Sequence, residues 1–244
     1  MKIILKRLGF WLLLPVSAVQ GLWLRRTAVR LPEATGDRSG VCGQGETLHL
    51  LALGDSIIAG VGTGTIEQSL PVQFAVALSK VRMCSVQWKV KGANGADISD
   101  LRHSIDQFHS GQQADVILIS IGVNDVTGLS STSYWRFQLD QLMLELRKRW
   151  PQANVIFAGL PPMDQFPLPP QPLRFTLGLR AATLDNIAAG IISRQTGMLH
   201  IPTDISPLEH DFCEDGFHPS AESCGNWGRE LAQRFEADNL GSKV

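Results

Sequence analysis

Short apolar runs alternate with helical patterns along most of the chain, and this alternation leaves few folds open. Five runs suit strands, at 48–53, 86–90, 116–121, 155–158 and 198–201. The stretch "DVILISIG" is apolar at nearly every position, as expected of a strand that is buried on both faces. Five helical patterns follow the strands or lie between them, at 70–81, 98–108, 135–149, 177–194 and 222–235. The alternation predicts an α/β fold with one doubly wound, mostly parallel five-stranded sheet.

The first 30 residues differ from the rest in charge and hydropathy. They carry six basic side chains and no acidic one, and they contain the apolar run "LGFWLLLPVSAVQGLWL" at 8–24. A helix of this length spans about 25 Å, close to a thin hydrocarbon core. Trp11 and Trp23 lie near its two ends, as aromatic residues do at membrane interfaces. We expect 1–30 to be an uncleaved membrane anchor that places the body outside the cytoplasm, in the periplasm or at the cell surface. A cleaved signal peptide and a peripheral helix are the alternatives.

Residues 31–46 are rich in Gly, Pro and polar groups and predict a linker, so the folded domain is expected at 47–244. Beyond residue 30 the chain has 16 basic and 23 acidic side chains. This acidic balance argues against nucleic acid as a partner, because phosphate binding needs a basic patch. No cofactor is expected.

The first strand-like run ends in "LALGDSIIAG", where an acid and a hydroxyl, Asp55 and Ser56, directly follow Gly54. All three residue types are common in turns, so the stretch fits either a plain turn or a nucleophile. Open α/β sheets bind their ligands outside the carboxyl ends of the strands. Partners of a nucleophilic Ser56 should therefore follow other strands or lie in a late loop at the same edge.

Candidate partners occur at these places. Gly95 lies in "VKGANGADISDL" after the second strand, Asn124 lies in "IGVNDV" after the third, and "DGFHPS" places Asp215 three residues before His218. A serine hydroxyl needs a base to remove its proton, and an imidazole with a pKa near ~6.5 is suited to that task. A carboxylate can hold the imidazole in the right tautomer. Pro219 disfavours the α region for the residue before it, which keeps His218 on an extended segment.

With these blocks in this order, the chain resembles the GDSL, or SGNH, family of serine hydrolases over about 48–235. The resemblance implies a flavodoxin-like sheet, with Ser56 as the nucleophile and Asp215 and His218 as the rest of a catalytic triad. Ile57 stands where the family usually has leucine, which is a mild departure at a packing position.

The resemblance also implies an oxyanion hole. Its donors are expected to be the backbone N–H groups of Ser56 and Gly95 and the side-chain amide of Asn124. Such donors stabilise the charge that develops on the substrate oxygen. Asp55 and Asp125 are expected to brace turns rather than to take part in the reaction.

The implied reaction is hydrolysis of a carboxylic ester through an acyl-serine intermediate. Thioesters and acyl lipids fit the same chemistry, and a carbohydrate O-acetylesterase of the same fold is the alternative. The segment after the fourth strand holds six of the thirteen prolines between residues 161 and 172, which predicts a stiff loop. Its apolar side chains either cover the sheet or form a wall for an acyl chain; they are Met163, Phe166, Leu168, Leu173 and Phe175.

Two other functions compete with the hydrolase. The stretch "HDFCEDGFH", followed by one more cysteine, offers zinc-type ligands at a spacing that matches no common structural site: His210, Cys213, Asp215, His218 and Cys224. A binding module that lost its activity is the second competitor. The remaining histidines are expected to be surface or packing residues; they are His49, His103, His109 and His200.

The four cysteines, Cys42, Cys84, Cys213 and Cys224, fit either disulfides or free thiols. A bridge between Cys213 and Cys224 would close a loop of about twelve residues and contribute ~3 kcal/mol by the chain-entropy estimate. It would also restrain the loop that carries His218. Two separately packed thiols are the alternative.

Overall fold

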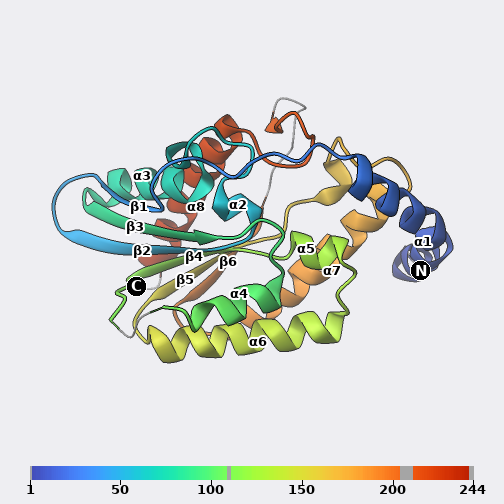
Figure 1. Cartoon of the computed structure of the whole chain (residues 1–244). Coiled ribbons are helices and arrows are strands. Elements are labelled where there is room, and N and C mark those ends of the chain that lie inside the picture. The colour runs from blue at the N-terminus through green and yellow to red at the C-terminus, as the bar shows by residue number, and fades with distance from the viewer. Residues whose placement is uncertain (1, 109–110, 204–210, 242–244) are drawn as a thin grey trace.

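The computed structural model describes residues 2–108, 111–203 and 211–241, with the backbone alone for 2–11 and 239–241. A central sheet separates two layers of helices (Figure 1). One face carries α2, α3 and α8, and the other carries α4, α6 and α7. Each face has its own cluster of buried apolar side chains. The two clusters give the doubly wound α/β arrangement that the alternating pattern predicts.

The sheet has six strands in the order β1-β3-β2-β4-β5-β6. The five predicted strands are all present and pair in parallel. They are β2 (Thr47–Gly54), β3 (Ser85–Gly92), β4 (Val116–Ser120), β5 (Asn154–Ala158) and β6 (Met198–Ile201). The sixth, β1 (Ser39–Cys42), comes from the segment expected to be a linker and pairs antiparallel with β3 at the sheet edge. An edge strand needs no long apolar run, and the side chains of β1 are exposed or half-buried, which explains why the apolar pattern does not predict it.

The five predicted helices are also present, with shifted ends. They are α3 (Leu70–Arg82), α4 (Ile98–Ile105), α6 (Thr132–Arg149), α7 (Leu173–Ile192) and α8 (Ala221–Gly241). Short helical turns add α2 (Ser56–Ala59), η1 (Ile66–Gln68), α5 (Val123–Thr127) and η2 (Met163–Gln165). The stiff loop ends earlier than expected: α7 begins directly after Pro172, so Leu173 and Phe175 belong to the helix.

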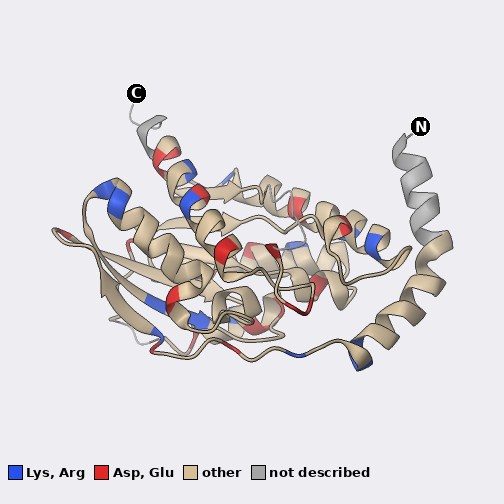
Figure 2. Ribbon diagram, turned by 90° about the horizontal axis from the view of Figure 1, so that it is seen from above, with Lys and Arg blue, Asp and Glu red and all other residues tan. Residues whose placement is uncertain are grey.

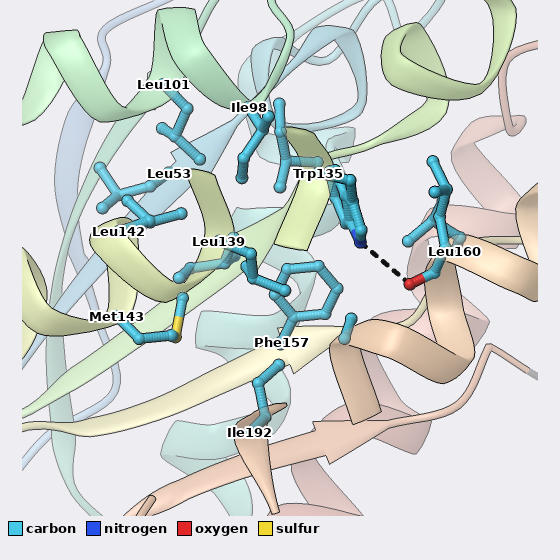
Figure 3. Packing of buried hydrophobic residues seen from close by; sticks show 14 of the residues in the cluster. Leu53, Ile98, Leu101, Trp135, Leu139, Leu142, Met143, Phe157, Leu160 and Ile192 are labelled. Atoms are coloured by element: carbon cyan, nitrogen blue, oxygen red, sulfur yellow. Dashed lines mark hydrogen bonds between the residues drawn. The ribbon is translucent and has the colours of Figure 1, made fainter. Parts of the chain in front are cut away.

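Trp135 anchors the layer formed by α4, α6 and α7. It is fully buried, and Figure 3 shows it among Leu139, Phe157 and Leu160. Its Nε1 donates a hydrogen bond to the Leu184 carbonyl at 3.0 Å, which satisfies the one polar group of the ring. This packing ties α6 to α7 within the layer that covers one face of the sheet.

The apolar run at 8–24 lies within a long N-terminal helix, α1 (Lys2–Thr27), which contains Pro15. Figure 2 shows α1 extending from one end of the body, with basic residues near its C-terminal end. In the part of the chain that the structure describes, no helix combines the length and apolar character needed to cross a membrane. The predicted membrane span therefore finds no support in the structure.

Candidate active site

Ser56 lies at the carboxyl end of β2, as the first residue of α2. The turn before it is tight, because a Cβ on Gly54 would lie 1.9 Å from the carbonyl oxygen of Ser120, so glycine is required there. Asp55 caps α2, and its Oδ1 accepts a hydrogen bond from Ile57 N at 3.0 Å. The turn thus places the Ser56 hydroxyl at the carboxyl edge of the sheet.

The structure joins Ser56, His218 and Asp215 in one chain of hydrogen bonds. His218 Nε2 lies 2.9 Å from Ser56 Oγ, and His218 Nδ1 lies 2.6 Å from Asp215 Oδ2. Asp215 Oδ1 also accepts hydrogen bonds from the backbone N–H groups of Phe217 and His218, at 2.9 and 3.0 Å. Burial acts to raise the pKa of Asp215, but these hydrogen bonds, with that from the His218 side chain foremost, hold it below its usual value. An ionised carboxylate can only accept, so Nδ1 carries the proton and Nε2 is free to accept from the serine.

Hydrogen bonds hold the loop that carries Asp215 and His218. Cys213 N donates to the His218 carbonyl at 2.8 Å. The Cys213 thiol lies within hydrogen-bond distance of the carbonyl oxygens of Gly62 and Pro219, at 3.4 and 3.3 Å. Gly62 lies in the loop after α2, so the thiol connects the loop of the histidine to the loop of the serine.

No bridge joins Cys213 and Cys224, and all four cysteines are free, which agrees with the alternative of separately packed thiols. Cys224 is buried on α8, where burial raises the pKa of its thiol to about 12. Such a thiol is hardly ionised at neutral pH, and the thiolate is the form that reacts. Cys213 points instead toward Gly62. The loop of His218 is therefore held without a covalent link.

Gly95 and Asn124 lie in the loops after β3 and β4, the two strands that flank β2. Asn124 is in the first turn of α5, and its Nδ2 donates one hydrogen to the Ala96 carbonyl at 2.8 Å. The second amide hydrogen remains for another acceptor. Gly95 has a φ of +83°, and a Cβ there would meet nothing within 4 Å, so this backbone turn faces open space. The three predicted oxyanion donors thus lie on adjacent loops at one edge.

A second buried carboxylate, Asp125, braces the same edge. Its Oδ2 accepts a hydrogen bond from Ile98 N at 3.0 Å, and its Oδ1 accepts one from Ser130 Oγ at 2.9 Å. Burial raises the pKa of Asp125 to about 6. Asp125 connects the start of α4 to the loop after α5, and Asp55 holds the turn of α2. Both carboxylates brace turns, as predicted.

A small pocket of about 30 Å³ adjoins Ser56 and His218, with Phe166 and Trp227 among its walls. This is about the room that one or two water molecules need. Trp227 lies on α8, and the sequence does not indicate its place at the site, because an apolar residue on a helical pattern gives no sign of which side chains it will face.

The five apolar residues expected to form an acyl wall divide among several places. Phe166 lines the small pocket, and Leu168 and Leu173 line a larger groove that His218 also lines. Met163 is buried in the core and Phe175 is half-buried on α7. Three of the five residues therefore line hollows beside His218, and two do not.

The alternative metal site gains no support. Within the described ranges, no group of His, Cys, Asp or Glu side chains is placed to hold a metal ion, and His210 lies outside those ranges. Three of the other histidines make structural contacts: His49 with Asp115 at 3.0 Å, His103 with the Ser99 carbonyl at 2.7 Å, and His200 with Asp185 at 2.8 Å. His109 also lies outside the described residues.

A mostly parallel sheet with a serine, a histidine and a carboxylate joined at its carboxyl edge is the arrangement of a serine hydrolase with an α/β fold. A family model described as the GDSL-like lipase/acylhydrolase family matches residues 52–223. The chain belongs to this family. Among curated protein sequences, none matches the chain significantly.

Solved structures agree on the fold. A lipase from a goat rumen metagenome has 18% identity and a TM-score of 0.64, over 78% of this chain and 96% of that one. A family 3 carbohydrate esterase from Clostridium thermocellum has 17% identity and a TM-score of 0.63, over 81% of this chain and 98% of that one. An extracellular lipase from Streptomyces rimosus has 19% identity and a TM-score of 0.59, over 77% of this chain and 99% of that one.

Proposed function

We propose that this protein hydrolyses carboxylic esters through an acyl intermediate on Ser56. The observation that carries the proposal is the continuous chain of hydrogen bonds from Ser56 Oγ through His218 to Asp215, at 2.9 and 2.6 Å. His218 takes the serine proton as Oγ attacks the ester carbonyl, and returns it to the leaving alcohol. Water then repeats the sequence and releases the acid. Asp215 stabilises the imidazolium formed in each step.

The developing oxyanion is bound by the N–H groups of Ser56 and Gly95 and by the free amide hydrogen of Asn124. Donors fixed before the reaction need no rearrangement, and loss of one typically costs ~10²–10³ in rate. The bond from Asn124 to the Ala96 carbonyl supports this role, because it fixes the orientation of the amide.

A carbohydrate O-acetylesterase is the second candidate. The small pocket of about 30 Å³ beside Ser56 has room for a small group such as the methyl of an acetyl ester. Family 3 and family 2 carbohydrate esterases are among the solved structures of similar fold. Acetylated xylan and p-nitrophenyl acetate, assayed side by side, separate a carbohydrate acetylesterase from a general esterase.

The test of the shared mechanism is Ser56→Ala in the full chain. We expect loss of p-nitrophenyl ester hydrolysis with an unchanged circular dichroism spectrum, since one hydroxyl contributes little to the fold. Ser133→Ala, at an exposed position on α6, is the control and should retain the native rate. A Ser56→Ala protein that still hydrolyses esters at the native rate would disprove the assignment of the nucleophile.

A further inference from the structure

A larger groove, of about 410 Å³, opens beside His218 between the C-terminal end of α1 and the start of α7. Leu24 and Ala28 contribute to the wall on the α1 side, and Leu173 and Leu177 form the wall on α7. The volume lies in the usual range for small-molecule sites. The N-terminal helix, expected from its sequence to be a membrane anchor, therefore lines a groove that reaches the triad.

Specific hydrogen bonds hold α1 in this position. Gln20 Nε2 donates to the Gln171 carbonyl at 2.9 Å, and Gln20 Oε1 accepts from Leu173 N at 3.1 Å, so this side chain caps the start of α7. One turn further on, Arg25 Nη2 donates to the Thr127 carbonyl at 2.9 Å, at the end of α5. These contacts join α1 to elements on both sides of the groove, so α1 forms a fixed wall.

The groove is lined by polar side chains at the end near the triad and mostly by apolar ones elsewhere. Asn124, Asp215 and His218 line it where it meets the triad. Apart from Arg25 and Thr127, which bond to each other, the other lining residues are apolar or glycine. A sugar would leave its hydroxyl groups without partners on such walls, and buried polar groups without hydrogen bonds are costly. An alkyl chain needs no partners and gains from each contact.

From this layout we propose that α1 and α7 form an acyl-chain site, and that the substrates are esters of unbranched apolar acids of medium length. The proposal rests on the proposed ester hydrolysis and adds the substrate class and the wall that selects it. The chain lies between Leu24 and Leu177, with its carbonyl at the Asn124 end of the groove. The small pocket beside Ser56 is too narrow for such a chain.

The test fills the groove from the α1 side with Gly21→Phe in the full chain. Gly21 lines the groove, and a Cβ there would lie 4.0 Å from Leu173 Cδ1, an ordinary contact, so the new ring can enter without a clash at its base. Leu22→Phe is the matched control, because Leu22 is the next residue of the same helix and is 59% exposed. The measured quantity is kcat/KM for p-nitrophenyl octanoate divided by that for p-nitrophenyl acetate.

We expect Gly21→Phe to lower this ratio at least about tenfold. Each methylene of the octanoyl chain that is kept out of apolar contact should lower kcat/KM about fourfold. Leu22→Phe should leave the ratio within about twofold of native. Ala28→Phe fills the same groove from beyond the end of α1 and repeats the test if Gly21→Phe does not fold. A native ratio in both filled variants, with active enzyme, overturns the acyl-chain site and leaves the ester hydrolase intact. A native protein that cleaves neither ester overturns the proposed function, and this inference with it.

Discussion

Asp55 directly precedes the proposed nucleophile, and its burial makes the stability of the fold depend on pH. The side chain is fully buried; Oδ1 accepts from Ile57 N at 3.0 Å, and no described residue bonds to Oδ2. The pKa of Asp55 is raised from 3.8 to about 7, chiefly by burial and to a lesser degree by the nearby Asp125, against the lowering effects of the Ile57 N–H and His218. The folded protein therefore keeps this proton to a higher pH than the unfolded chain does.

The sign and size of the effect follow from linkage. Between about pH 4 and pH 7 the folded state binds more protons at Asp55, so the free energy of unfolding falls as the pH rises. A difference of about three pKa units is worth on the order of 4 kcal/mol over that window. Asp55→Asn removes the ionisation and keeps an oxygen that can accept from Ile57 N. Over the same pH window, the free energy of unfolding of the variant should therefore fall by on the order of 4 kcal/mol less than that of the native protein.

The assay is urea unfolding followed by tryptophan fluorescence. It is repeated at several pH values from about 4.5 to about 7.5, which covers most of the window in which Asp55 titrates. Asp106→Asn, at an exposed position after α4, is the control and should follow the native curve. Asp125 remains in both proteins, so part of the decline persists in Asp55→Asn. If native protein and Asp55→Asn lose stability in parallel across the window, Asp55 does not hold a proton in the folded state and the reasoning fails.

Three further predictions concern the site and its support. Asn124→Ala should lower kcat by about 10²-fold with little change in KM, measured by steady-state kinetics; a change confined to KM would make Asn124 a binding residue. Asp215→Asn should lower kcat by about 10⁴-fold, because the amide no longer fixes the tautomer of His218. A decrease in kcat of less than about tenfold in the same kinetic assay would argue against the triad. Gly122→Ala should destabilise the fold by about 2 kcal/mol or more in urea unfolding, since Gly122 has a φ of +120° and a Cβ there would lie 2.8 Å from the Trp135 ring; native stability would contradict this.

The sequence carries a clear signal where a segment is buried on both faces or is fixed by the chemistry of the site. β4 is buried at every position, and its apolar run predicts it directly. Ser56 and His218 lie 162 positions apart and meet at 2.9 Å because both lie at the carboxyl edge of the sheet, which the order of strands and helices predicts. The edge strand β1 gives no such signal, because half of its residues are exposed and none is fully buried.

Tertiary contacts explain the remaining differences. The position of α1 depends on Gln20 and Arg25 reaching carbonyl groups on distant segments, and no periodic pattern indicates such pairs. The sequence leaves open whether Cys213 and Cys224 form a disulfide; in the structure they do not, because they face different neighbours, a loop carbonyl and the helix interface respectively. Sequence separation alone does not tell which way a side chain points.

The central claim is that His218 activates Ser56 as a nucleophile, and labelling by a fluorophosphonate probe tests it most directly. The native chain is treated with the probe and digested, and its peptides are searched by mass spectrometry for the modified residue. The account predicts a single adduct on the peptide that contains Ser56, and a much slower reaction in His218→Gln, which lacks the base at 2.9 Å from the hydroxyl. An unlabelled Ser56, or a labelling rate that His218→Gln does not change, would contradict the account.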